Sequence, residues 1–191
     1  MPNRDNVMGF RPAHGVGRQH VYWEFSINAA NGTAVFIGDV VKLVAAGAVN
    51  PSAAGDATIV AGVVTQLFDT NRVTIGHPSS VVATKYLPAS TAGYAIVALA
   101  IDGAIFIAQG QTGQTPAAAD VGATTDHVAG AGDTTTAVSK HELNFGDLNT
   151  GGQFRIMGLV DEPGNTWAEN ADVYVMFNES AFMGSGAATG V

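Results

Sequence analysis

The chain alternates short apolar runs with turn-forming residues. Such runs occupy residues 40–44 (VVKLV), 59–69 (IVAGVVTQLFD), 154–160 (FRIMGLV) and 173–178 (VYVMFN), and glycine, proline, asparagine or aspartate interrupts the chain between them. Short runs rich in β-branched residues and bounded by turn residues are typical of strands. The pattern therefore predicts a mainly β protein, with an antiparallel β-sandwich or barrel-like body.

A longer apolar stretch, residues 86–109, contains a single charge, Asp102. The pair Asp102-Gly103 favours a two-residue hairpin turn, so we expect the strands on either side of it to pair with each other. Both faces of that hairpin are apolar, because successive side chains point to opposite faces. One face must then be covered by a second layer of the fold or by another subunit. The residues predicted to make this contact are Ala98, Ile105 and Ile107.

The remaining segments are less strongly patterned. Asn31-Gly32 separates two apolar runs and predicts a second hairpin, and Pro163-Gly164 predicts a turn. Residues 111–132 are small and polar, which favours a long loop with one helical turn at residues 116–121. Residues 134–143 have both polar and apolar positions and are expected to form a strand.

The domain organisation expected from this pattern is simple. A chain of 191 residues is long enough for one domain with a sizeable core. We predict an extended N-terminal arm over residues 1–20, a single β domain over residues 21–183 and a flexible glycine-rich tail over residues 184–191.

Composition narrows the class of protein. Apolar residues make up 47% of the chain and charged residues only 13%, against about a quarter in average soluble proteins. There is no cysteine, which excludes disulfides and thiolate metal sites. No apolar run reaches the ~20 residues that span a bilayer, and the N-terminus lacks the apolar middle of a secretory signal, so we expect a soluble protein without a membrane partner.

The charge is unevenly distributed. The net charge is −8, yet the first 20 residues carry three arginines against one acid, Asp5. The acidic remainder disfavours nucleic acid binding, because phosphate requires a positive surface. We interpret the arm as a segment that docks on an acidic protein surface. Contact with phosphate and a free, solvated arm are the alternatives.

No sequence motif for catalysis or metal binding is present. The five histidines occur in no HExxH motif or helical pair, and there is no GxSxG elbow or phosphate-binding loop. Loop acids without EF-hand spacing are expected to be solvated. We predict a protein that is not an enzyme and has no catalytic residue, cofactor or metal. Trp23 and Trp167 are compatible with a sugar or base platform, although core or interface packing is the preferred interpretation.

Five segments in a fixed order resemble a family of structural proteins of tailed bacteriophages, the capsid cement or head decoration proteins. They are NRDNVMGFRPAHG, FIGDVVKL, YLPASTAGYAIVALAIDGAIFIAQ, AAADVGATTDHVAGAGDTTTAVSKHEL and RIMGLVDEPGNTWAENADVYVMFN. The resemblance implies a virion protein made in the bacterial cytoplasm. It would bind the outer capsid surface and clamp neighbouring major capsid subunits. A homo-oligomer is also expected, with a trimer favoured over a dimer.

The resemblance and the charge pattern together give candidate contact residues. The expected capsid contacts are Arg4, Phe10, Arg11, Pro12 and Arg18. The alternative for this segment is that it packs on its own body. The alternative function is a receptor-binding or glycan-binding protein of the head surface, which would use Trp23 or Trp167 on exposed loops.

Overall fold

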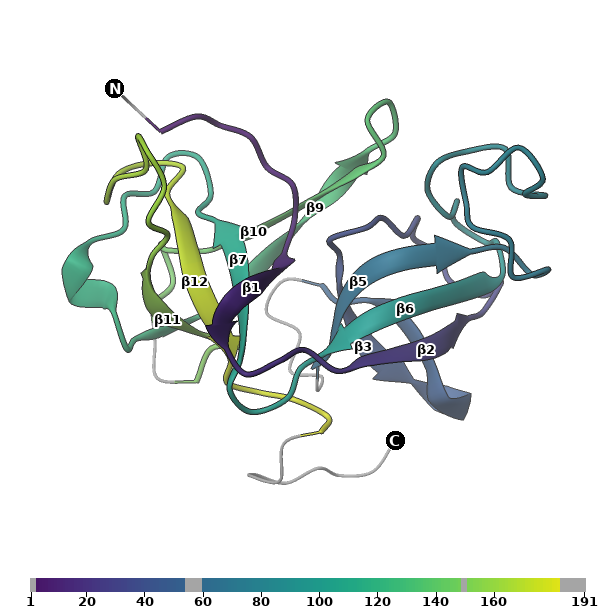
Figure 1. Cartoon of the computed structure of the whole chain (residues 1–191), viewed down its shortest axis with the longest axis horizontal. Helices are drawn as coiled ribbons and strands as arrows, with labels where there is room; N and C mark the ends of the chain where they lie inside the picture. The colour runs from purple at the N-terminus through teal and green to yellow at the C-terminus, as the bar shows by residue number, and fades with distance from the viewer. Residues whose placement is uncertain (1–2, 54–59, 149–150, 183–191) are drawn as a thin grey trace.

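The computed structural model describes residues 3–53, 60–148 and 151–182 and shows a mainly β protein with antiparallel sheets, which confirms the predicted sandwich-like fold class. Two five-stranded sheets lie beside each other, with a two-stranded hairpin between them (Figure 1). Within those described ranges, no helix has the length and apolar character needed to cross a membrane.

The first sheet contains both the first and the last strand in chain order. Its strand order is β1-β7-β12-β11-β8, and every neighbouring pair is antiparallel. The strands are β1 (Arg11–Gly17), β7 (Ala104–Gln109), β12 (Asp172–Phe177), β11 (Phe154–Leu159) and β8 (Thr124–Thr125).

The second sheet has the order β2-β6-β5-β3-β4 and curls so that its edge strands β2 and β4 approach each other. Its strands are β2 (Tyr22–Ile27), β6 (Gly93–Leu99), β5 (Val60–Phe68), β3 (Val40–Val44) and β4 (Ala48–Pro51). Strands β9 (His127–Asp133) and β10 (Val138–Leu143) form the hairpin. Two short 3-10 turns, η1 (Ala45–Gly47) and η2 (Ala118–Asp120), complete the fold.

Apolar side chains form two cores. One core joins the two sheets and contains Phe106 and Val175 from the first sheet with Val63 and Ala98 from the second. The other core lies within the curled second sheet and includes Leu67. The two faces of β6 therefore contribute to different cores, because its side chains alternate along the strand.

The predicted hairpin at Asp102-Gly103 is wrong in its pairing. Strands β6 and β7 form on either side of a turn at these residues, as expected, but β6 pairs with β2 and β5 while β7 pairs with β1 and β12. The chain crosses from one sheet to the other at this point. Both apolar faces of the stretch are thus largely buried by the protein's own sheets, which a hairpin between β6 and β7 would not allow.

Two other local predictions are corrected. Asn31-Gly32 does not close a hairpin, because β2 pairs with β6 and Val35 forms an isolated bridge with Leu87 instead. Residues 111–132 are not one long loop, since β8 and most of β9 lie within them. The helical turn expected there is present as η2, and the turn at residues 163–164 is also present. The predicted tail, 184–191, lies outside the described residues.

Candidate docking surface on the N-terminal segment

The N-terminal segment packs on the body rather than extending from it. Residues 11–17 are strand β1, which pairs with β7 at the edge of the first sheet. The prediction of a separate extended arm is therefore wrong for these residues, and the alternative that the segment packs on its own body describes them. Apolar side chains that follow Gly9 provide the physical reason, because they complete the core of the first sheet.

Phe10 is a core residue. Its side chain is 1% exposed and lies 4.6 Å from the ring of Phe154, measured between ring centroids. Its backbone N–H donates to the carbonyl oxygen of Gly38 at 2.9 Å. The prediction that Phe10 contacts a capsid surface is corrected accordingly. Pro12 is half-buried and lies opposite Phe106 in the β1–β7 pairing.

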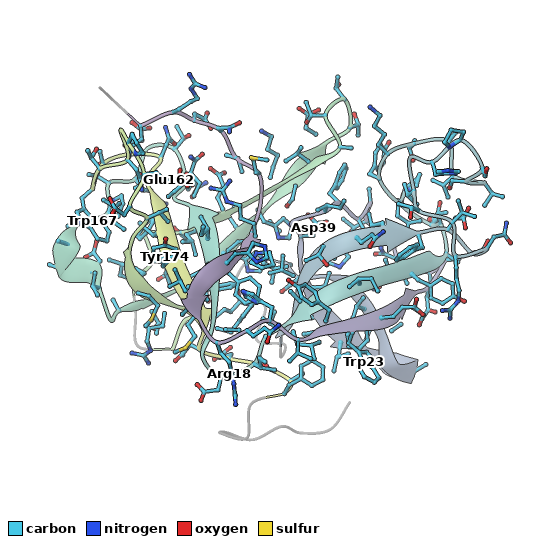
Figure 2. All side chains as sticks on the ribbon, viewed as in Figure 1. Arg18, Trp23, Asp39, Glu162, Trp167 and Tyr174 are labelled. Carbon is cyan, nitrogen blue, oxygen red and sulfur yellow. The ribbon has the colours of Figure 1, made fainter. Side chains whose placement is uncertain are left out.

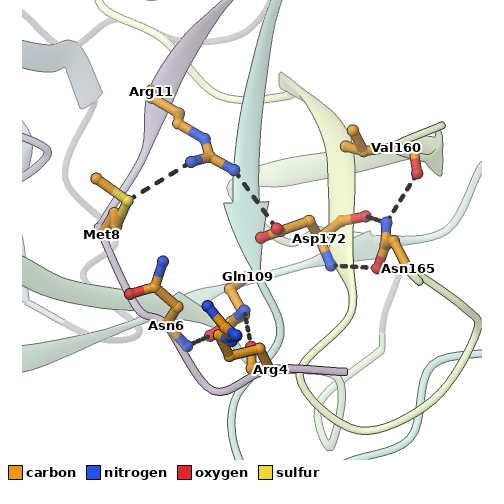
Figure 3. Close-up of polar contacts among 8 residues, drawn as sticks. All are labelled: Arg4, Asn6, Met8, Arg11, Gln109, Val160, Asn165 and Asp172. Carbon is orange, nitrogen blue, oxygen red and sulfur yellow. Dashed lines mark hydrogen bonds and ion pairs between the residues drawn. The ribbon is translucent and has the colours of Figure 1, made fainter. Parts of the chain in front are cut away.

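Side-chain hydrogen bonds attach residues 3–6 to the end of β7 and to the loop between β11 and β12. The Asn3 amide donates to the carbonyl oxygens of Thr166 at 2.8 Å and Glu169 at 3.0 Å. Gln109 accepts from the N–H of Asn6 at 3.1 Å and donates to the carbonyl oxygen of Arg4 at 3.0 Å (Figure 3). Backbone groups of this segment thus find partners without forming a strand.

The three predicted arginines differ in their surroundings. Arg11 is half-buried and forms an ion pair with Asp172, with 3.4 Å between the guanidinium nitrogen and the carboxylate oxygen (Figure 3). Burial raises the pKa of Asp172, and the Arg11 charge opposes that shift only in part. Arg4 and Arg18 are exposed, and Arg18 lies at the surface near the β6–β7 turn (Figure 2). Arg4 and Arg18 are therefore accessible to a partner.

Exposed apolar side chains surround this segment. Of the eleven large apolar side chains exposed among the described residues, six lie between positions 8 and 37. Four of these, which we call the N-terminal face, are Met8, Val16, Tyr22 and Ile37. Met8, Tyr22 and Ile37 border a hollow of about 300 Å³ that Arg11 and His14 also line. Arg18 lines a second hollow together with Val16 and Tyr22. An apolar surface with an exposed arginine at its margin is suited to contact with a protein surface that is partly acidic.

His20 lies beneath the same segment and has a structural role. It is 8% exposed, and burial lowers its pKa, so the ring is neutral near neutral pH. Its Nε2 atom lies 3.2 Å from the carbonyl oxygen of Ala13, and its ring contacts Phe106 edge to face. The histidine thus fixes the turn between β1 and β2, which comprises residues 18–21.

The residues predicted to contact a second layer or a second subunit are mostly covered by the chain itself. Ala98 is fully buried in the core that joins the two sheets. Ile105 is 6% exposed and packs against Gly17, whereas Ile107 is half-buried on the outer side of β7. Ala98 therefore contacts a second layer of the same fold. Of the three predicted residues, only Ile107 has a partly exposed side chain that another subunit could contact.

A buried ionisable pair was not predicted. Asp39 and His141 are 2% and 3% exposed, with 3.5 Å between the carboxylate oxygen Oδ1 and the imidazole Nε2. Burial raises the pKa of Asp39 to about 7 and lowers the pKa of His141 to about 3. The N–H of Val40 donates to Nδ1 of His141 at 3.2 Å, so the neutral ring carries its proton on Nε2. No local motif marks the pair, because its members are distant in the sequence.

The two tryptophans differ in exposure. Trp167 packs against the shared core, and Trp23 is 62% exposed at the edge of the second sheet (Figure 2). Across the part of the chain that the structure describes, no group of three or more His, Cys, Asp or Glu side chains is placed to hold a metal ion.

The geometry defines a mainly β protein with two five-stranded sheets, a two-stranded hairpin and one group of exposed apolar side chains, the N-terminal face. Comparison with protein families, with curated proteins and with solved structures found no match.

Proposed function

We propose that the chain is a virion structural protein that binds the outer surface of an icosahedral phage capsid and clamps neighbouring major capsid subunits. The observation that carries this proposal is the N-terminal face. Its exposed apolar side chains lie beside Arg11 and Arg18 on a protein whose net charge is −8. The ordered resemblance of five sequence segments to cement proteins supports the same function.

The shape of the N-terminal face suits side-chain docking. Strand β1 contains Pro12 and a register break between Pro12 and Gly17, two features that hinder addition of a further strand at a sheet edge. A partner would therefore contact the side chains of Met8, Tyr22 and Ile37 rather than the backbone of β1. An interface of standard size buries ~1,600 Å² in total, which exceeds what these side chains offer alone. Neighbouring exposed surface, including Arg4 and Arg18, completes the contact.

Clamping needs several contacts for each decorated site. A homo-oligomer, with a trimer favoured over a dimer, would present one N-terminal face from each copy to the shell. Linked contacts raise the overall affinity without any new kind of interaction. Ile107, which is half-buried on the outer side of β7, is the predicted subunit contact with exposed surface.

Binding to undecorated capsid shells tests the proposal. We expect the protein to sediment with expanded shells, and Ile37→Asp to weaken this binding at least tenfold because the charge would lie in the contact. Val81→Asp is the matched control, since Val81 is 65% exposed but lies far from the N-terminal face in the sequence and lines none of its hollow. Equal binding by the two variants would refute the assignment of the N-terminal face. Absence of binding by the unmodified protein would refute the function.

A glycan-binding or receptor-binding role is the second candidate, favoured by the exposure of Trp23. An aromatic ring as exposed as that of Trp23 can stack on a sugar ring. Saturable binding of the free protein to host cells, lost in Trp23→Ala and unaffected by Ile37→Asp, would favour this function over the cement function.

A further inference from the structure

A polar hollow lies between the N-terminal segment and the loop that joins β11 to β12. Its volume is about 390 Å³, and Asn6, Gln109, Glu162 and Asp172 are among the residues that line it. Gln109 is 4% exposed, so it lies at the base of the polar hollow. These residues are far apart in the sequence, and the tertiary structure rather than a local motif brings them together.

Hydrogen bonds fix both walls of the polar hollow. On one side, Gln109 accepts from the N–H of Asn6 and donates to the carbonyl oxygen of Arg4 (Figure 3). On the other side, the Asn165 amide donates to the carbonyl oxygen of Asp172 at 2.7 Å and accepts from its N–H at 3.1 Å. The backbone of each wall is therefore held in place before a ligand binds, as is usual for small-molecule sites.

Several polar groups at the polar hollow keep their hydrogen-bonding capacity. Arg4, Asn6 and Glu162 are exposed, and their side chains form no hydrogen bond within the part of the chain that the structure describes. Asp172 contacts Arg11 through Oδ2, which leaves Oδ1 to accept. Donors on the N-terminal wall thus lie across from carboxylate acceptors on the other wall.

The charges at the polar hollow are balanced. The charged residues that line it among those described are Arg4, Glu162 and Asp172, and Asp172 is paired with Arg11. Burial raises the pKa of Asp172 and the charge of Glu162 adds to this shift, so the two carboxyl groups lie near each other. An anion would be repelled by these carboxylates, and a cation would be repelled by the two guanidinium groups. A neutral polar ligand is repelled by neither.

We propose that the polar hollow binds a neutral carbohydrate. Sugar hydroxyls both donate and accept, and two adjacent hydroxyls match the paired N–H groups of a guanidinium or the two oxygens of a carboxylate. Tyr174 lies two residues after Asp172 on the same face of β12 and is half-buried, so an aromatic ring is present about 7 Å along the strand (Figure 2). This site goes beyond the proposed function and does not depend on it.

Titration of the free, isotope-labelled full chain with three simple sugars tests the site. The probes are the methyl α-glycosides of D-glucose, D-galactose and D-mannose, followed by amide NMR. We expect at least one of them to shift the side-chain amide signals of Asn6 saturably, with a Kd on the order of 1 mM.

Two neighbouring acids provide a matched pair of variants. Glu162→Ala removes an acceptor from the polar hollow and should weaken sugar binding at least fivefold. Asp161→Ala removes the adjacent acid, which is also exposed but does not line the polar hollow, and should bind as the unmodified chain does. Because both side chains are exposed, neither substitution should disturb the core.

Ionic probes separate a neutral ligand from the charged alternatives. Sodium phosphate and ethylammonium chloride should shift the Asn6 side-chain signals less than the bound sugar does at equal concentration. The proposal is overturned if none of the three glycosides shifts these signals up to about 10 mM, ten times the expected Kd. It is also overturned if either ion produces the larger shift, or if Glu162→Ala binds as tightly as Asp161→Ala. No capsid shell is present in this experiment, so none of these outcomes bears on the proposed capsid binding.

Discussion

Replacing either member of the buried Asp39–His141 pair should make folding stability depend on pH. In the intact pair the contributions of the two residues to this dependence cancel. The ordinary pKa values are 3.8 for Asp39 and 6.5 for His141, and the folded protein shifts them in opposite directions, to about 7 and about 3. Between pH 4 and 6.5, the unfolded chain has an ionised Asp39 and a protonated His141, so the pair holds one proton. The folded pair also holds one proton in this range. Stability depends on pH only where the two states bind different numbers of protons, so the pair contributes almost no slope here.

In each single variant only one of the two groups remains, so folding stability changes with pH, and it does so in opposite directions in the two variants. In Asp39→Asn, His141 remains and its folded pKa is lowered, so its contribution is present above pH 6.5 and is lost as the pH falls toward 3. In His141→Gln, Asp39 remains and its folded pKa is raised, so its contribution is present below pH 3.8 and is lost as the pH rises through 7. Each slope is at most about 1.4 kcal/mol per pH unit, which gives roughly 2 kcal/mol between pH 4.5 and 6.5.

Urea unfolding at pH 4.5, 5.5 and 6.5, followed by tryptophan fluorescence, measures these slopes. The comparison uses the difference between each variant and the unmodified protein, because Glu142, Asp172 and Glu179 also titrate with raised pKa values and contribute equally to all three proteins. Relative to the unmodified protein, Asp39→Asn should gain stability as the pH rises and His141→Gln should lose it. Parallel curves for all three proteins would refute the reasoning.

Three further predictions concern packing and charge. Phe10→Ala should destabilise the protein by about 3–5 kcal/mol in urea unfolding, whereas Met8→Ala, two residues earlier and 44% exposed, should change stability by less than about 0.5 kcal/mol. Gly62→Ala should cost about 1–3 kcal/mol in the same assay, because the added Cβ would overlap the backbone oxygen of Ala98. Arg11→Ala should cost less than about 1 kcal/mol, since its ion pair is partly exposed, and a larger loss of thermal stability would show that the pair is structural.

Local sequence patterns were sufficient to place several strands. The runs at residues 40–44, 154–160 and 173–178 became β3, β11 and β12 with bounds close to those expected, because β-branched residues between turn signals specify an extended chain locally. The fold class follows from the same local information.

Strand partners could not be predicted in this way. A turn at Asp102-Gly103 is compatible both with a hairpin and with a crossing between sheets, and only burial of both faces of β6 in separate cores decides between them. Strand β9 was missed because alanine and glycine have low strand propensity, and its position comes from pairing with β10. The contact of Asp39 with His141 depends on that same tertiary arrangement.

The turn of residues 18–21 has a mechanical consequence. It joins β1, at the edge of one sheet, directly to β2, at the edge of the other. A pull applied to the N-terminal face would consequently be divided between two separate hydrogen-bond ladders, β1–β7 and β2–β6. Neither sheet would carry the whole force, and detachment of the segment by force would require both ladders to yield.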